Sequence, residues 1–312
     1  MKIRAPCKIN LHLEVKDRRP DGFHNLESLF VSLAFGDELY FELTEETGFW
    51  ALRLAETSDS GMESGDFTGE NNLISRAVSL FRAKTGFNHG LKCVLEKNIP
   101  LGAGLGGGSS NAASTLLALN ELANTGLSED ELLDMALSLG SDVPFFIKAG
   151  MDKTGKNTAA LVRGRGEHII PVRLPPEYPV LLVKPPFRSN TTEAFAFLSQ
   201  YRKKNTGFNA GPTVKPCPEG LDKAWASSPD QWPFFNDFLN ILPKKEIYHE
   251  ILRELKTMGA LFTGLSGSGS CCYGIFNDVK TAQMAESTIK SRKIEKIFTR
   301  LTFFLAKIPN QY

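Results

Sequence analysis

The sequence predicts an α+β fold, in which helices and strands are mixed along the chain. Residues 2–16 alternate between apolar and polar side chains, which is the period of a strand with one buried face. The strands that follow are not strictly succeeded by helices, which argues against a doubly wound parallel sheet.

Length, charge and cysteine content restrict the class of protein. The 312 residues accommodate one large domain or two moderate ones. The balance of 36 basic and 35 acidic residues argues against a general nucleic-acid binder. No apolar run approaches the roughly 18 residues of a membrane span, and the N-terminus lacks a signal-peptide pattern. The 5 cysteines follow no disulfide framework, so reduced thiols in a cytoplasmic protein are expected. The sequence makes no prediction of the oligomeric state.

The strands are predicted from alternation and from short apolar runs. Pro6 interrupts the first strand, and because proline cannot donate a ladder hydrogen bond it indicates an edge position or a bulge. Shorter strands are expected at 38–43, 50–54, 91–95, 180–183 and 298–305.

The helices are predicted from their capping residues. Asn72 begins a helix with Ile74 and Phe81 on its apolar face, and Gly86 stands just past its end. Ser128 and Glu131 form a capping box that begins another helix. Further helices are expected from about Ser109, from Thr191 or Thr192 through Phe195, over 246–258 and near Thr281.

Residues 205–233 show no periodicity and are rich in glycine, proline and serine. A stretch of this length without periodic structure is uncommon inside a compact domain. The segment is therefore predicted to be a surface insertion that is partly disordered.

The strongest chemical signal is a glycine loop between the strand at 91–95 and the following helix. It holds five glycines, at Gly102, Gly104, Gly106, Gly107 and Gly108. Glycines allow backbone N–H groups to point into one concave space, and a helix N-terminus adds positive potential. Ser109 and Ser110 place hydroxyls at that end. The arrangement suits a polyphosphate, and the alternative is a flexible turn.

Two charged residues are candidates for acid–base chemistry. Lys8 shares a strand face with Asn10, although a lysine on an edge strand is often only a solvated charge. Asp142 precedes Pro144 in a segment that also suits a turn. A carboxylate beside a lysine can instead accept the proton of a substrate hydroxyl. The histidines and cysteines show no metal-ligand spacing, so no metal site is predicted.

Residues 100–113, PLGAGLGGGSSNAA, resemble the phosphate loop of the kinase superfamily named for galactokinase, homoserine kinase, mevalonate kinase and phosphomevalonate kinase. The longer form GLGGGSSNAA resembles in particular that of the 4-diphosphocytidyl-2-C-methyl-D-erythritol kinases. The resemblance spans most of residues 1–200 and 234–276. It extends, in the family's order, to APCKINLHLEV, RRPDGFHNLESLF, NNLISRA, SDVPFF, GRGE, PPF with TTEAF, NDF and LSGSGSCCYGIF.

The resemblance implies a two-domain small-molecule kinase fold. It implies a nucleotide-binding domain over 1–165 that resembles domain 2 of ribosomal protein S5, and a ferredoxin-like substrate-side domain over 166–312. The implied reaction is ATP-dependent phosphorylation of the 2-hydroxyl of 4-diphosphocytidyl-2-C-methyl-D-erythritol, a step of non-mevalonate isoprenoid biosynthesis. Mg²⁺ is expected with the nucleotide, and the partner is a small molecule carrying cytidine diphosphate, with no nucleic acid and no membrane.

The same resemblance assigns site residues by motif position. Lys8 and Asp142 are the implied catalytic pair. The implied ATP site is formed by Asn72, Lys97, Pro100, Gly102, Gly104, Leu105, Gly106, Gly107, Gly108, Ser109, Ser110 and Asn111. The implied site for the cytidine diphosphate part is formed by Asn10, Phe23, His24, Thr191 and Phe195. The family usually has tyrosine where Phe23 stands, which keeps base stacking and loses a hydroxyl.

Two alternative functions are weighed against this one. A sibling kinase acting on mevalonate, homoserine or a sugar is disfavoured by the Phe23–His24 pair and by the extra loop glycine. A non-catalytic ligand sensor on the same fold is disfavoured because Lys8 and Asp142 are both present.

Overall fold

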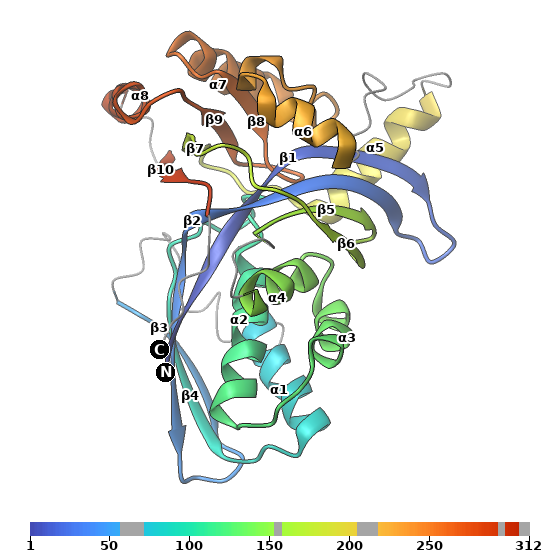
Figure 1. Cartoon of the computed structure of the whole chain (residues 1–312), viewed down its shortest axis with the longest axis vertical. Helices are drawn as coiled ribbons and strands as arrows, with labels where there is room; N and C mark the ends of the chain where they lie inside the picture. Colours follow the sequence, from blue (N-terminus) through green and yellow to red (C-terminus); the bar gives the residue numbers. More distant parts are fainter. Residues whose placement is uncertain (57–71, 153–157, 205–217, 293–296, 306–312) are drawn as a thin grey trace.

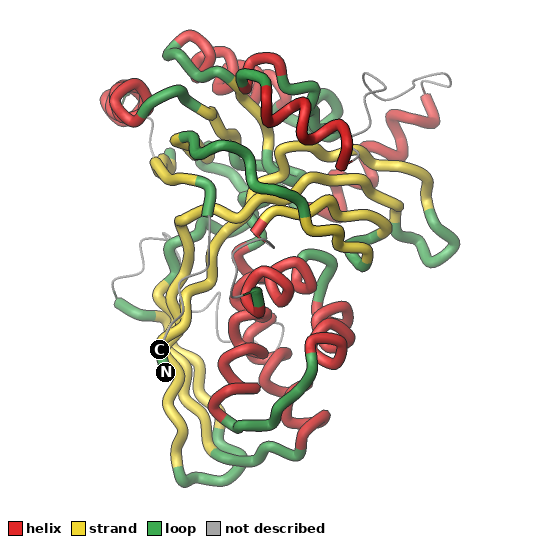
Figure 2. Tube along the Cα trace, viewed as in Figure 1, coloured by secondary structure: helices red, strands yellow, loops and turns green. Residues whose placement is uncertain are grey.

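The computed structural model describes residues 1–56, 72–152, 158–204, 218–292 and 297–305. These residues form two β-sheets, each covered by helices on one side (Figures 1 and 2). A long strand pair runs from the lower, helix-covered part of the molecule into the upper part, where it meets the second sheet (Figure 1). The predicted α+β class is confirmed.

The large sheet has the strand order β3-β4-β2-β5-β6, and β1 pairs with β2. Its pairings are antiparallel except for β3 with β4, which is parallel. The strands are β1 (Lys2–Arg18), β2 (His24–Thr44), β3 (Trp50–Leu54), β4 (Gly90–Glu96), β5 (Ala159–Gly164) and β6 (His168–Pro171).

The first strand is confirmed, and a register shift between Pro6 and Lys8 confirms the bulge. β2 is much longer than the predicted 38–43. Its first half was missed because it is buried on both faces. Phe30 packs against the helices, whereas Leu29 and Val31 face the second sheet. A strand buried on both sides lacks the alternation by which strands are recognised.

One face of the large sheet is covered by four described helices, α1 (Leu73–Thr85), α2 (Gly107–Leu122), α3 (Glu129–Leu139) and α4 (Val143–Met151). The predicted caps are confirmed: the Asn72 side chain accepts from the Ile74 N–H, and Ser128 and Glu131 form the capping box. α4 was not predicted, since residues 143–147 at its start are all apolar and all buried, and so show no helical period.

The second sheet is antiparallel with the order β10-β7-β9-β8. It packs one face on the bulged end of the long strand pair, and its other face is covered by helices. The elements are β7 (Pro179–Lys184), β8 (Phe262–Leu265), β9 (Cys272–Ile275), β10 (Phe298–Phe303), α5 (Thr191–Lys204), α7 (Lys245–Thr257) and α8 (Val279–Ser291).

The predictions for this half are confirmed for the strands at 180–183 and 298–305 and for the helices at 246–258 and near Thr281. The predicted cap of α5 is wrong. The side chain of Asn190 accepts from the N–H groups of Thr192, at 2.9 Å, and Glu193, so neither threonine caps the helix.

The predicted insertion is partly wrong. Residues 205–217 lie outside the described residues, but 218–233 are not a surface loop. They form α6 (Pro218–Ala226) and a short 3₁₀ turn, η3 (Pro229–Gln231). Trp225 and Trp232 are buried between the two sheets, and each indole N–H donates to a backbone carbonyl. A few large side chains anchor this segment, and such sparse anchors leave no periodic signal.

Four cysteines lie in the described residues and all are free and buried: Cys7, Cys93, Cys271 and Cys272. Burial raises the pKa of the Cys93 and Cys271 thiols to about 12. Within the described ranges, no helix has both the length and the apolar character needed to cross a membrane.

Candidate active site

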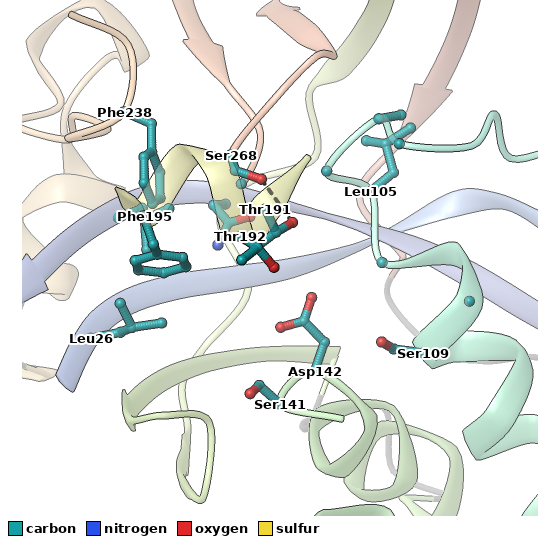
Figure 3. Close-up of a pocket in the computed structure, with 18 of the residues that line it drawn as sticks. Leu26, Leu105, Ser109, Ser141, Asp142, Thr191, Thr192, Phe195, Phe238 and Ser268 are labelled. Atoms are coloured by element: carbon teal, nitrogen blue, oxygen red, sulfur yellow. Dashed lines mark hydrogen bonds between the residues drawn. The ribbon is translucent and has the colours of Figure 1, made fainter. Parts of the chain in front are cut away.

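A cavity of about 820 Å³ lies where the large sheet, its helical layer and the second sheet meet. Its walls come from β1, β2, the β4–α2 loop, the starts of α4 and α5, and the β8–β9 loop. Figure 3 shows side chains from several of these segments projecting into one space. The predicted site residues that line it are Lys8, Asn10, Phe23, His24, Lys97, Pro100, Gly102, Gly104, Leu105, Gly106, Gly107, Gly108, Ser109, Asp142, Thr191 and Phe195.

Lys8 and Asp142 come together in this cavity, with Lys8 Nζ 3.3 Å from Asp142 Oδ2. The lysine is not a solvated surface charge, since it is only 3% exposed and its ammonium lies over the Phe30 ring. Asp142 occupies the N-cap position of α4, yet its side chain makes no capping bond. Its carboxylate instead projects into the cavity toward the start of α5 (Figure 3). The pair is therefore available to a ligand.

The bulge in β1 sets the position of Lys8. Directly after the bulge, the Lys8 N–H donates to the carbonyl oxygen of Leu105 at 3.0 Å. The glycine loop thus pairs with the strand that carries the lysine. A Cβ on Gly106 would lie 3.1 Å from Lys8 Cγ, and the residue has a φ of 70°, so a larger residue there would strain the loop and press on the lysine.

The glycine loop leads directly into α2. The helix begins at Gly107, two residues before the predicted start, and Gly106 occupies the N-cap position with φ of 70°. The first backbone N–H groups of a helix have no intrahelical acceptor. Since glycine brings no capping side chain, these groups and the Ser109 hydroxyl remain available at the cavity wall. Together they suit an anion such as a phosphate.

Three residues predicted for ATP are not brought to the cavity wall. Asn72 uses its amide oxygen to cap α1. Ser110 and Asn111 are buried within α2, where the Ser110 hydroxyl and the Asn111 amide oxygen have no hydrogen-bond partner. Their neighbours Leu73 and Ser109 line the cavity instead.

Lys97 lines the cavity but is almost completely buried beside the glycine loop. It is buried with Asp37, which its ammonium contacts at 2.5 Å, and it also donates to the Ile99 carbonyl. Burial lowers the pKa of Lys97, and the negative charge of Asp37 opposes that shift. A Cβ on Gly107 would lie 3.2 Å from Lys97 Nζ, which places the ammonium against the start of α2. Lys97 therefore supports the loop through a buried ion pair.

The second glycine cluster, 264–270, lies directly against the first. Ser266 donates its hydroxyl to the Gly104 carbonyl at 2.9 Å, and the Ser270 N–H donates to the Gly102 carbonyl. A Cβ on Gly104 would lie 2.1 Å from the Ser266 carbonyl oxygen, so no larger residue fits this contact. The two loops, one from each half of the chain, form one wall of the cavity.

The far end of the cavity is aromatic. His24 and Phe195 stack with ring centroids 5.2 Å apart and planes 18° apart, and Phe238 meets Phe195 edge-on. Burial lowers the pKa of His24, and the charges of nearby arginines add to this effect. Phe23 is 50% exposed, and the Arg165 guanidinium lies 5.1 Å from its ring centre. Because His24 covers one face of Phe195, a base that stacks on that face must displace the imidazole.

Several residues of the site were missed by sequence reasoning. Arg165, in the GRGE segment, lines the cavity. Ser28, in HNLESLF, accepts a hydrogen bond from the Asn10 amide. Asn236, in the NDF segment, donates to the carbonyls of Leu265 and Gly267 and so holds the second glycine loop. These three segments had been singled out only by resemblance, which gave these residues no role.

Comparison with known families agrees with this geometry. Residues 72–150 match the GHMP kinases N terminal domain and residues 238–293 match the GHMP kinases C terminal domain. The crystal structure of a mevalonate kinase from Methanococcus jannaschii superposes with a TM-score of 0.66 at 14% identity, covering 99% of this chain and 98% of that chain. That likeness shows the fold, and the predicted two-domain kinase architecture is confirmed.

Closer relatives share one function name. The 4-diphosphocytidyl-2-C-methyl-D-erythritol kinase of Prochlorococcus marinus (strain MIT 9301) is 35% identical over 91% of this chain and 88% of its own length. That of Caldanaerobacter subterraneus subsp. tengcongensis is 34% identical over 93% of both chains. A crystal structure of 4-(cytidine 5'-diphospho)-2C-methyl-D-erythritol kinase has a TM-score of 0.72 at 29% identity, covering 97% of this chain and 99% of that chain. The chain belongs to the 4-diphosphocytidyl-2-C-methyl-D-erythritol kinase family within the GHMP kinases.

Proposed function

We propose that this chain transfers the γ-phosphoryl group of ATP to the 2-hydroxyl of 4-diphosphocytidyl-2-C-methyl-D-erythritol, in non-mevalonate isoprenoid biosynthesis. The observation that carries the proposal is the Lys8–Asp142 pair, at 3.3 Å, in a cavity that also receives the open N-terminus of α2. Phosphoryl transfer depends mainly on positioning and on placed positive charge, and this pair supplies both.

In this proposal Asp142 is the general base. Its carboxylate accepts the proton of the 2-hydroxyl as the oxygen–phosphorus bond forms, and the bond from the γ-phosphorus to the bridging oxygen breaks to release ADP. The Lys8 ammonium lies where negative charge develops on the transferred group. Because Lys8 is buried, its charge is screened less by water than that of a surface lysine.

The phosphates of ATP are assigned to the N-terminus of α2, with its backbone N–H groups and Ser109. Mg²⁺ bound with the nucleotide would neutralise phosphate charge. Phosphate oxygens and waters would hold it beside the Ser109 hydroxyl, which leaves the Asp142 carboxylate free to act as the base.

The cytidine diphosphate part is assigned to the aromatic end, with Phe23, His24, Thr191 and Phe195. The Asn10 amide, also predicted for this part, bonds Lys8 and Ser28 and is assigned to the lysine instead. Stacking tolerates any base, so His24 is the residue proposed to distinguish cytosine by its polar edge. In the same proposal 1–165 is the nucleotide-binding domain and 166–312 the substrate-side domain. The cavity has an anion site at the N-terminus of α2 and a separate aromatic site at its far end. This separation supports an acceptor that carries a nucleotide of its own.

An ATP-consumption assay tests this function with 4-diphosphocytidyl-2-C-methyl-D-erythritol, mevalonate and homoserine as acceptors. Turnover is expected with the first acceptor alone. Asp142→Asn should reduce kcat by about 10²–10⁴-fold while ATP affinity changes little, since only the base is lost. Lys8→Ala should be comparably severe, and the double variant should lose less than the product of the two effects.

Asp134→Asn is the matched control, because Asp134 is an exposed carboxylate on α3 outside the cavity. It should keep parental turnover. Near-normal turnover by Asp142→Asn would remove that residue from the mechanism, and turnover only with mevalonate or homoserine would replace the proposed acceptor.

A further inference from the structure

A chain of buried hydrogen bonds runs from the catalytic lysine into the sheet. Lys8 Nζ donates to Asn10 Oδ1 at 2.6 Å, and Asn10 Nδ2 donates to Ser28 Oγ at 2.8 Å. The Ser28 hydroxyl then donates to the backbone carbonyl of His12 at 2.6 Å. The three side chains are almost completely buried, and Ser28 has no exposed surface at all.

The two ends of this series of hydrogen bonds fix the direction of every bond in it. A backbone carbonyl can only accept, so the Ser28 hydroxyl must give its proton to His12. Ser28 Oγ is then left as an acceptor and selects the NH₂ side of the Asn10 amide. At the other end an ammonium can only donate, and it meets the oxygen side of the same amide. The opposite amide orientation would set NH₂ against ammonium.

Strand pairing brings Ser28 to this point. Lys8 and Asn10 lie on the same side of β1, a register shift follows between Asn10 and His12, and Ser28 lies on β2, paired with Leu13. Of the three donors on Lys8 Nζ, one goes to Asn10 and another faces Asp142. Asn10 therefore limits how far the flexible lysine side chain can rotate, and Ser28 limits how Asn10 can turn.

We propose that Ser28 is a positioning residue for phosphoryl transfer, which fixes the Asn10 amide so that Lys8 stays directed at Asp142. The proposal rests on the function proposed above for Lys8 and Asp142. Ser28 contacts neither substrate in this proposal, and it affects the rate of the chemical step.

The test compares four variants: Ser28→Ala, Ser28→Cys, Ser28→Thr and Ser32→Ala. Cysteine keeps the side-chain volume but is a weak hydrogen-bonding group, whereas threonine keeps the hydroxyl. Ser32 is the matched control, because it is an equally buried serine on β2 whose hydroxyl has no hydrogen-bond partner. Ser32 pairs with Lys8 across the two strands, so its removal takes away the same atom close to the lysine without breaking any of these hydrogen bonds.

Ser28→Ala and Ser28→Cys should each reduce kcat by about 10- to 100-fold, the effect expected of a misplaced catalytic group. KM for both substrates should stay within about twofold, Ser28→Thr should restore most of the turnover, and Ser32→Ala should match the parent. In an Asn10→Ala background, Ser28→Ala should cause no further loss of kcat, because it acts through Asn10. Normal kcat in Ser28→Cys, or losses that multiply with those of Asn10→Ala, would overturn the proposal.

A crystal structure of Ser28→Cys supplies a readout that does not depend on turnover. Loss of the 3.3 Å approach between Lys8 and Asp142 is expected, and an unchanged pair would overturn the positioning role. If the parent protein phosphorylates none of the acceptors, the proposed function fails, while the geometry of the variant still decides whether Ser28 positions Lys8.

Discussion

At the scale of single residues, Phe195 is the central ring of the aromatic end of the cavity. It stacks on His24, contacts Phe238 edge-on and is carried by the first turns of α5. Phe197 lies two residues further along the same helix but is 37% exposed and does not line the cavity. The two phenylalanines therefore separate ring stacking from the general cost of removing an aromatic side chain.

Phe195→Ala should weaken binding of cytidine diphosphate by roughly 10- to 100-fold, because stacking on an aromatic ring contributes about 1–3 kcal/mol. ATP affinity should change little, since the ATP phosphates are assigned to α2. Isothermal titration with each nucleotide measures both values. Phe197→Ala should retain parental affinity for both nucleotides, and equal weakening by the two substitutions would place the pyrimidine elsewhere.

At the scale of elements, the glycine loop before α2 is fixed from two sides. The Leu105 carbonyl accepts from β1, and the carbonyls of Gly102 and Gly104 accept from the β8–β9 loop. Such double anchoring holds the N-terminus of α2 in place before any ligand arrives. Preorganised donors of this kind need not be reorganised at the moment of reaction.

Gly106→Ala tests this element. Gly106 and Gly126 both have positive φ, 70° and 64°, so alanine costs about 1–2 kcal/mol of strain at either position. An added Cβ meets Lys8 Cγ and the Phe146 ring at 3.1 Å in the first case and nothing within 4 Å in the second. Steady-state kinetics should show kcat/KM reduced by about 10- to 100-fold for Gly106→Ala only. Urea unfolding should show a loss of stability for both, larger for Gly106→Ala because of its two contacts, and equal kinetics would contradict the role given to the loop.

The elements differ in how far the sequence predicts them, for physical reasons. Helices with local caps were found at their correct starts, as at Asn72 and Ser128, because a cap and its partner lie within a few residues. The first half of β2 and α4 were missed because both are buried on opposite faces. α6 was missed because its packing depends on Trp225 meeting Trp232 across a turn.

At the scale of the whole molecule, the site combines residues from distant parts of the sequence. Lys8 and Asp142 were assigned by resemblance, and nothing in their local patterns required them to meet. Resemblance assigned Lys97 to the ATP site, and only the fold reveals that its ammonium is paired with the buried Asp37 carboxylate. Ser28 could not be inferred at all without the register of β1 on β2.

Global stability should depend on pH through His12. Burial and the charge of Lys16 lower the pKa of His12 from 6.5 to about 4. Between these values the unfolded chain binds a proton that the folded chain does not, so stability falls as pH falls. From pH 7 to pH 5 this group alone should remove about 2 kcal/mol from the free energy of unfolding.

Urea unfolding at pH 7 and pH 5 measures this contribution. His12→Asn should show a fall in stability about 2 kcal/mol smaller than that of the parent, because asparagine does not titrate there. His168→Asn, which removes an exposed histidine on β6, should show the full parental fall. Identical falls in all three proteins would exclude His12 as the source.

The buried thiols can report how the molecule unfolds, because they lie in different parts of the core. Cys93 lies in the core under the large sheet, Cys271 between the two sheets and Cys272 in the core beyond the second sheet. Thiolates are the reactive form, so thiols that are buried with a raised pKa react with alkylating reagents only after the surrounding structure has separated. The order in which these three positions acquire label would reveal which half of the molecule separates first, with no introduced probe.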